Sequence, residues 1–189
     1  MCSSDLVSTD CPKIASVAME YGANVIHRPA ELATDKASEW DAWKHAVSYV
    51  QEKEGSFDNF LSLPATAPLR KTKDINDCLS LLKKGFDIGL TMAKANRNPW
   101  FNMVRKDSKD CINLICNDGK PKRRQDAPEC YDLTTVAYAA RTEFIMNNDS
   151  IWEGKVGGVE IPFERSIDID NEIDFCIAEF LYKRNDASE

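Results

Sequence analysis

The sequence predicts an α/β fold with a mainly parallel sheet, and two observations lead to this prediction. Short apolar runs of strand character alternate with segments whose apolar residues recur every three or four positions, as on one face of a helix. Glycine and proline residues stand between these segments and mark their ends. A chain of 189 residues, of which 43% are hydrophobic and 29% charged, has the size and composition of one globular domain.

The first half of the chain contains three expected strands, each associated with a helix. The strands are apolar runs at residues 6–9, 24–26 and 60–63. The helices are periodic segments at residues 14–21, 38–50 and 75–82. Ser38 and Asp41, three residues apart, form a capping box that begins the second helix. Gly22 and Gly85 end the first and the third.

The second half continues the alternation around an inserted arm. Further strands are expected at residues 88–93, 136–140 and 156–161. Residues 111–116 and the turn at 117–119 (Asn-Asp-Gly) indicate a small β-hairpin arm. A last helix carries apolar residues from Ile173 to Leu181. We therefore expect a single domain over residues 7–182 and a fraying polar tail at 183–189.

The charge and the cysteines limit the classes of function. Twenty-four Lys and Arg residues against 31 Asp and Glu give a net charge of −7, which argues against non-specific nucleic-acid binding. No apolar run reaches the roughly 18 to 20 residues that cross a bilayer, and no basic-then-apolar leader opens the chain. The seven cysteines contain no Cys-x-x-Cys pair, which favours reduced thiols in a cytoplasmic protein over a zinc site or disulfides.

Three loops that follow apolar strands hold clustered polar residues, which is where an α/β fold is expected to bind its ligand. Residues 27–38 run from a strand end to a helix N-terminus, where free backbone amides favour anions; the alternative is a plain connection. Residues 63–70 form a loop stiffened by prolines that can hold the Thr66 hydroxyl and the Arg70 charge towards a ligand.

The third loop, residues 165–170, carries two carboxylates. Asp168 and Asp170 lie two residues apart in an extended segment, so their side chains point to one side. Mg²⁺ prefers carboxylates, water and substrate phosphates, and the pair therefore fits a phosphate-transfer site. The alternative is that Asp170 only caps the following helix. The basic run at 120–125 is either an anion site or a solvated turn.

Taken together, four segments resemble the acylneuraminate cytidylyltransferases, also called CMP-sialic acid synthetases. In chain order they are residues 28–35 (RPAELATD), 65–70 (ATAPLR), 123–128 (RRQDAP) and 166–170 (SIDID). They match the family in order and spacing along nearly the whole chain, with Val-Ser-Thr-Asp at 7–10 ahead of them. The resemblance implies a Rossmann-like nucleotidyltransferase fold in which the hairpin is a dimerisation arm.

The resemblance also implies a reaction and a set of site residues. The anomeric hydroxyl of a nonulosonic (sialic-type) acid would attack the α-phosphate of CTP and expel pyrophosphate, with Mg²⁺ assisting and a homodimer completing the sugar pocket. The implied nucleotide-binding residues are Arg28, Ala37, Ser38 and Thr66. The implied substrate-binding residues are Arg70, Arg124, Gln125 and Tyr138. Asp168 and Asp170 match the catalytic metal-binding pair.

The chain departs from the family pattern at three places. Pro64 replaces a ligand-contacting Gln, and Thr134-Thr135 replaces Asn-Gly, so the sugar could be N-acetylneuraminate, legionaminate, pseudaminate or another nonulosonate. The family's first strand and basic triphosphate loop are missing. We therefore expect residues 1–6 to be a non-native leader and the 189 residues alone to be inactive. The strand at 60–63 should then be an unpaired edge.

Two further functions remain as alternatives at the level of the sequence. One is a cytidylyltransferase for another sugar acid, such as 3-deoxy-manno-octulosonate. The other is a non-catalytic module that binds sugar nucleotides and keeps the dimer contacts without the transfer chemistry.

Overall fold

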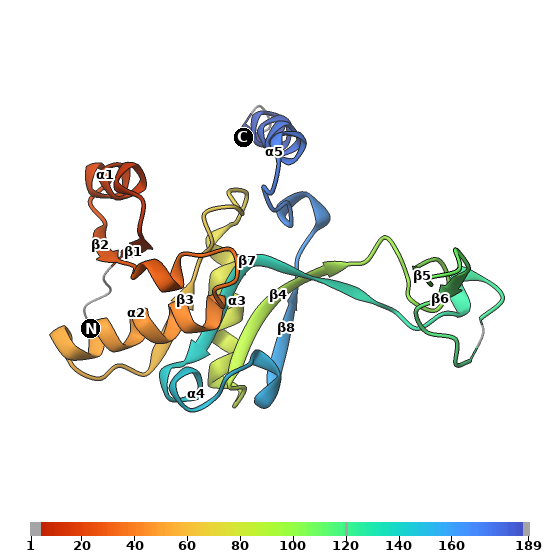
Figure 1. Cartoon of the computed structure of the whole chain (residues 1–189), viewed down its shortest axis with the longest axis horizontal. Helices are drawn as coiled ribbons and strands as arrows, with labels where there is room; N and C mark the ends of the chain where they lie inside the picture. Colours follow the sequence, from red (N-terminus) through yellow and green to blue (C-terminus); the bar gives the residue numbers. More distant parts are fainter. Residues whose placement is uncertain (1–4, 120, 187–189) are drawn as a thin grey trace.

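The structure, a computed structural model, describes residues 5–119 and 121–186 (Figure 1). Most of the expected leader at 1–6, the end of the expected tail and Lys120 of the basic run lie outside the described residues. The helices and strands are β1 (Leu6–Thr9), α1 (Pro12–Glu20), β2 (Asn24–His27), α2 (Glu39–Glu54), β3 (Asn59–Ser62), α3 (Thr72–Lys83), β4 (Ile88–Lys94), β5 (Val104–Lys106), β6 (Ile112–Leu114), β7 (Tyr131–Arg141), α4 (Thr142–Asn147), β8 (Val156–Glu160) and α5 (Glu172–Asp186). Over the described ranges, no helix is both long enough and apolar enough to cross a bilayer.

The α/β class is confirmed, but the main sheet is mixed and not uniformly parallel. Its four strands lie in the order β3–β7–β4–β8, and β7 runs antiparallel to both of its neighbours while β4 and β8 are parallel. The cause is the connection from β4 to β7. The chain leaves the sheet at the end of β4, forms the arm and returns beside β4, so that β4 and β7 make a long antiparallel hairpin. β1 and β2 form a separate parallel pair.

The expectation of an unpaired edge at residues 60–63 is confirmed. In the part of the chain that the structure describes, β3 pairs only with β7, and its other edge carries no strand. β1 likewise pairs only with β2. Both edges therefore present backbone groups that no described strand satisfies.

The hairpin arm exists, but its turn is not where the sequence placed it. β5 and β6 pair antiparallel, and the chain reverses at residues 107–111, not at 117–119. The Asp107 carboxylate fixes this reversal by accepting hydrogen bonds from the backbone N–H groups of Lys109 and Cys111, at 2.8 and 3.0 Å. The arm projects away from the body of the protein (Figure 1).

The core lies on both faces of the four-stranded sheet. On one face, Trp40 and Trp43 of α2 pack with Leu90, Tyr138 and Phe144. On the other face, α3 packs against the alternate residues of β7 through Cys78 and Leu82. Gly89 permits this second contact, because a Cβ at that position would lie 2.7 Å from the carbonyl oxygen of Cys78.

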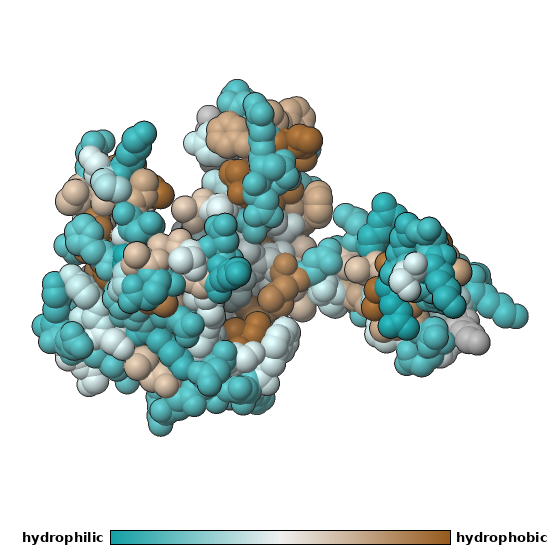
Figure 2. Space-filling model, viewed as in Figure 1, coloured by the Kyte–Doolittle hydropathy of each residue, from teal (hydrophilic) through white to brown (hydrophobic). Residues whose placement is uncertain are grey.

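Helices α1 and α5 form as predicted but bury little of their apolar faces. Ile14 and Val17 of α1 are each 53% exposed, and Ile173 and Phe180 of α5 are 72% and 64% exposed. Figure 1 shows both helices standing off the sheet, and Figure 2 shows apolar surface over α5. α5 also continues to Asp186, beyond residue 183 where the tail was expected to fray.

A bulge in β7 sets the position of Tyr138. Leu90 pairs with Tyr138, whereas Met92 pairs with Leu133, so Thr91 alone faces four residues of β7. The fully buried Thr91 hydroxyl fills this gap: it accepts hydrogen bonds from the Thr134 hydroxyl at 2.7 Å and from the Ala137 N–H at 3.2 Å. The Thr91 hydroxyl therefore serves two polar groups inside the bulge, whereas the buried Thr135 hydroxyl has no hydrogen-bond partner among the described residues.

Replacing this hydroxyl should destabilise the sheet. Thr91→Val leaves the Ala137 N–H and the Thr134 hydroxyl buried without a partner, which is expected to lower the free energy of unfolding by about 2 to 3 kcal/mol. Thr91→Ser keeps the hydroxyl and should cost about 1 kcal/mol or less. Urea unfolding followed by circular dichroism measures both. Equal losses for the two variants would mean that packing, and not the hydroxyl, holds the bulge.

Candidate functional site

The second and third predicted loops are joined to each other. The Ile169 N–H donates to the carbonyl oxygen of Thr66 at 2.9 Å. Ile167 and Ile169 pack with Leu69 and with α5. Because side chains alternate along an extended segment, Asp168 and Asp170 then occupy the opposite side from these isoleucines. The two loops thus form one unit next to the end of β3.

A buried ion pair anchors this unit. Arg165, in a short 3₁₀ turn before the third loop, donates to both oxygens of Asp74 at 2.7 and 2.9 Å. The Asp74 side chain is 2% exposed and also accepts from the backbone N–H of Lys71 at the start of α3. Such a two-point contact fixes orientation as well as distance. The ion pair thus ties the third loop to α3.

The first loop is held against β1. Arg28 donates from Nη2 to the backbone oxygen of Ser8 at 2.8 Å and from Nε to the Ser8 hydroxyl at 3.2 Å. The Ala37 N–H donates to the Thr34 oxygen, and the Ser38 hydroxyl caps α2 by accepting from the Trp40 N–H at 3.1 Å. The predicted cap at Ser38 is therefore confirmed.

Glu39 of α2 lies within electrostatic range of three ionisable groups from other elements, which are Arg28, Tyr138 and Asp168. The pKa of the Glu39 carboxyl is raised, chiefly because burial removes water from the carboxylate. The charge of Arg28 opposes this rise, and the charge of Asp168 adds to it. Burial raises the pKa of Tyr138 to about 12, with Glu39 and Asp168 adding to the effect. The first loop, α2, β7 and the third loop therefore meet at one place.

Asp168 is the better candidate of the two carboxylates for a metal ligand. Its Oδ1 atom is buried and makes no hydrogen bond to the described protein. The cap of α5 is Asn171, whose Oδ1 accepts from the N–H groups of Ile173 and Asp174. The alternative reading of Asp170 as the helix cap is therefore wrong. No group of three or more His, Cys, Asp or Glu residues suited to a metal occurs among the residues described.

Arg70 acts inside its own loop. Its guanidinium donates from Nη2 to the backbone oxygen of Pro64, and burial lowers its pKa. The Nε atom is buried and has no hydrogen-bond partner among the described residues. Arg70 thus closes the second loop and keeps one donor available.

Arg124 and Gln125 are not brought to the other site residues within this chain. They lie in a 3₁₀ turn at Arg124–Asp126, and both are exposed. Arg124 donates to the backbone oxygen of Asn96, which follows β4. Tyr138 lies opposite Leu90 of β4. The end of that strand, at Lys94, is four residues beyond Leu90, which is about 13 Å along an extended chain. The expectation that Arg124 and Gln125 bind the substrate, in a pocket that a second subunit completes, stays a prediction.

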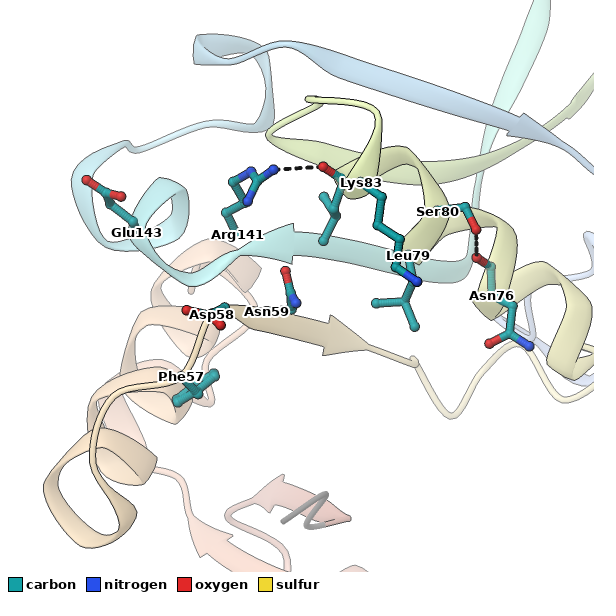
Figure 3. Close-up of a pocket in the computed structure, with 10 residues that line it drawn as sticks. Phe57, Asp58, Asn59, Asn76, Leu79, Ser80, Lys83, Arg141 and Glu143 are labelled. Carbon is teal, nitrogen blue, oxygen red and sulfur yellow. Dashed lines mark hydrogen bonds between the residues drawn. The ribbon is translucent and has the colours of Figure 1, made fainter. Parts of the chain in front are cut away.

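A hollow that none of the three loops lines lies elsewhere, between α3 and the edge strand β3. It encloses about 620 Å³ and is lined by none of the predicted site residues (Figure 3). Arg141 crosses it to donate to the backbone oxygen of Leu82 at 2.7 Å. This hollow faces α3, on the opposite side of the sheet from Tyr138.

Glu39 and the Asp74–Arg165 ion pair are two features of the site that the sequence patterns did not predict. Glu39 directly follows the predicted cap Ser38, so its place at a helix N-terminus beside the first loop was available as a signal. The ion pair joins residues 91 positions apart, and nothing local marks either partner.

Comparison of the structure with solved structures defines the fold. No protein-family model matches the chain. A CMP:2-keto-3-deoxy-manno-octonic acid synthetase in complex with CTP superposes with a TM-score of 0.63 at 13% identity, covering 96% of this chain and 82% of that one. The 4-diphosphocytidyl-2C-methyl-D-erythritol synthase of Anaerococcus prevotii gives 0.61 at 13% identity, covering 92% and 77%. The fold is that of a nucleotidyltransferase.

Sequence relatives define the family. Post-translational flagellin modification protein B of Campylobacter coli is 33% identical over 94% of this chain and 76% of its own length. The CMP-N,N'-diacetyllegionaminic acid synthase of Campylobacter jejuni is 33% identical over 97% and 78%. An N-acylneuraminate cytidylyltransferase of Streptococcus agalactiae is 25% identical, with 40% of its length covered. The chain belongs to the acylneuraminate cytidylyltransferase family.

The two acidic residues of α3 give a test of the buried ion pair. Asp74→Asn leaves the Arg165 guanidinium largely buried without its charge partner and should lower the free energy of unfolding by about 3 kcal/mol. Asp77 pairs with Lys73 on the exposed side of the same helix, so Asp77→Asn should cost about 0.5 kcal/mol or less. Thermal and urea unfolding compare the two. Similar losses would show that the buried pair does not anchor the third loop.

Proposed function

We propose that the protein transfers CMP from CTP to the anomeric hydroxyl of a nonulosonic acid and releases pyrophosphate. The observation that carries this proposal is the 33% identity, over 97% of the chain, to a CMP-N,N'-diacetyllegionaminic acid synthase. The convergence of the first, second and third loops supports it, because those loops hold the segments that match the family. Such catalysis consists of positioning the reactants and neutralising charge, with little covalent chemistry for the protein.

The nucleotide would bind along the first loop and the start of α2. The backbone near Ala37 and Ser38 lies at the N-terminus of a 16-residue helix, which favours negative or hydrogen-bond-accepting groups. Arg28 brings a positive charge to the same place, and its contacts with Ser8 limit its rotation. Thr66 is exposed, and its backbone oxygen accepts from the N–H of Ile169, so it would meet the nucleotide from the side of Asp168.

Asp168 and Asp170 would hold Mg²⁺. The residues fit this ion, since Mg²⁺ prefers carboxylate oxygens and Asp168 offers a buried oxygen without a hydrogen-bond partner. When bound, the metal would neutralise charge on the phosphates and help to orient them. The ion pair between Asp74 and Arg165 would serve this site by fixing the loop that carries both carboxylates.

The sugar acid would bind between Tyr138 of one protomer and the arm of another, in a homodimer. This arrangement accounts for the position of Arg124, which is bonded to Asn96 beyond the end of β4 and so lies far from Tyr138 of its own chain. The arm also exposes Phe101, Met103 and Ile112, at 38%, 42% and 66%. Apolar side chains of this size on a projecting arm fit contact with a second copy. Arg124 and Gln125 would meet the substrate there, and Arg70 would meet it within the protomer.

A sugar acid such as 3-deoxy-manno-octulosonate is the weaker alternative substrate. It is favoured only by the structural likeness to the 2-keto-3-deoxy-manno-octonic acid synthetase. At 13% identity that likeness shows a common fold and does not indicate the substrate. We also propose that the protein works in the cytoplasm, where CTP is made and free thiols persist.

The proposal is tested by pyrophosphate release from CTP and Mg²⁺ with a panel of nonulosonic acids. The assay uses the 189-residue chain and a form extended with the N-terminal segment of the Campylobacter coli relative. Turnover in the extended form that requires both CTP and a nonulosonic acid is the expected result. Turnover in neither form, although both bind CTP, would contradict the proposal.

In the active form, loss of one metal ligand should affect turnover far more than stability. Asp168→Asn is expected to lower turnover at least a hundredfold and to raise the Mg²⁺ concentration needed for half-maximal rate. Glu179→Gln, at an exposed acidic residue of α5 that pairs with Lys183, is the control and should keep turnover within about threefold. Near-normal turnover of Asp168→Asn at limiting Mg²⁺ would show that Asp168 does not bind the metal.

Arg124 is predicted to act on the partner's site, which mixing of subunits can test. Arg124→Ala and Tyr138→Phe should each abolish most activity. Mixing the two variants in equal amounts creates dimers in which one site has both natural residues, so about a quarter of the natural activity should return. Activity that stays at the level of the separate variants would place Arg124 in another role.

A further inference from the structure

Asn98 joins the two limbs of the arm at its base, where the arm leaves the sheet. The residue is polar but only 8% exposed. Its Oδ1 atom accepts from the Trp100 N–H at 2.9 Å, which turns the outgoing limb after β4. Its Nδ2 atom donates to the backbone oxygen of Pro128 at 2.8 Å, on the returning limb before β7. One carboxamide therefore fixes a local turn and also a contact between residues 30 positions apart.

The backbone groups of Asn98 are used in the same way. Its carbonyl oxygen accepts from the N–H groups of Phe101, Asn102 and Met103, at 2.9 to 3.0 Å. Its own N–H donates to the Asn102 Oδ1 at 2.7 Å. Each polar group of this buried residue thus has a partner inside the arm, and the outgoing limb is wrapped around it.

The returning limb carries Arg124, and its turn is held at both ends. Pro128, four residues after Arg124, is tied to Asn98. Arg124 itself donates from Nη2 to the backbone oxygen of Asn96 at 3.0 Å, two residues before Asn98. The position of the Arg124 guanidinium therefore depends on how the two limbs meet at the base of the arm.

The neighbouring arginine has a different task. Arg123 donates from Nε and Nη2 to the two carboxylate oxygens of Asp126, at 2.9 and 2.7 Å, so its charge is paired inside the turn. The Arg124 hydrogen bond to the arm uses Nη2 alone. Of the two, Arg124 is the better placed to meet an anion, with Nε and Nη1 as donors.

We propose that Asn98 is a positioning residue that sets where Arg124 meets the sugar acid. The inference rests on the proposed function and adds to it a residue that does not touch the substrate. A guanidinium holds a carboxylate through two parallel donors, so a small displacement of its turn weakens that contact. Loss of Asn98 should affect the sugar acid and not CTP, because the proposed CTP residues lie on the body, from which the arm projects (Figure 1).

Two variants remove the contact between the limbs in different ways. In Asn98→Ser the hydroxyl still accepts from the Trp100 N–H, as serine does in turns, but is too short to reach Pro128. Asn98→Asp keeps the shape and the acceptor but places a carboxylate oxygen against the Pro128 oxygen. Asn102→Asp is the matched control, because the Oδ1 atom that Asn102 contributes is also present in aspartate.

Hydrogen exchange of the 189-residue chain measures the base of the arm directly. The amides of Ala95 and Cys116 donate across the base and should exchange at least tenfold faster in both Asn98 variants. The amides of the β5–β6 ladder further out should be unchanged. Asn102→Asp should leave both sets as in the natural chain. Unchanged exchange at the base in both Asn98 variants would overturn the inference.

The second measurement is the pyrophosphate assay on the N-terminally extended form. Both Asn98 variants should raise the Michaelis constant for the nonulosonic acid at least fivefold and change that for CTP less than twofold. Asn102→Asp should keep both within twofold. In a chain that already carries Arg124→Ala, adding Asn98→Ser should change the remaining kcat/KM for the acid less than twofold, because no guanidinium is left to position.

The other outcomes overturn the positioning role. Equal rises for both substrates, or an effect of Asn98→Ser that is undiminished without Arg124, would make Asn98 a structural residue of the arm and nothing more. Natural Michaelis constants in variants whose base exchanges faster would do the same. If the extended form of natural sequence shows no turnover with CTP and any nonulosonic acid, the proposed function itself fails, and this inference with it.

Discussion

The hydrogen-bonded ladder that holds β7 between β3 and β4 sets the positions of both faces of this protein. Because side chains alternate along the strand, Tyr138 and Ala140 face α2 while Ala137 and Ala139 face α3. The bulge opposite Thr91 shifts that register within the strand, and a one-residue shift would exchange the two faces. The same strand leads out to the arm, so the register of the body and the placement of the arm are coupled.

The candidate site depends on attachments between loops that share no secondary structure. The third loop is fixed to the second through Ile169 and Thr66, and to α3 through Arg165 and Asp74. Burial of an ion pair costs desolvation, so this pair is weak evidence of stability in itself. Its value is orientation, because a guanidinium held at two oxygens cannot rotate and the carboxylates that follow it are placed with it.

The arm explains why one chain carries only part of the predicted constellation. Arg28, Tyr138 and Asp168 lie within electrostatic range of Glu39 in the protomer, whereas Arg124 and Gln125 lie on the arm, where Arg124 is bonded to Asn96. A long hairpin moves side chains away from the sheet at about 3.3 Å per residue, which is an efficient way to reach another molecule. In the proposed dimer, the arm must extend away from its own sheet so that Arg124 and Gln125 can reach the partner's site.

The sequence by itself determined the alternation of strands and helices, the cap at Ser38 and the loops at 27–38, 63–70 and 165–170, because periodicity and end signals are local. Tertiary structure decided what depends on distant partners. It made β7 antiparallel, placed the arm's turn at Asp107, gave the cap of α5 to Asn171, and paired Asp74 with Arg165. Local pattern carries no information on which strand will lie beside which, or which buried charge will find its partner across 91 residues.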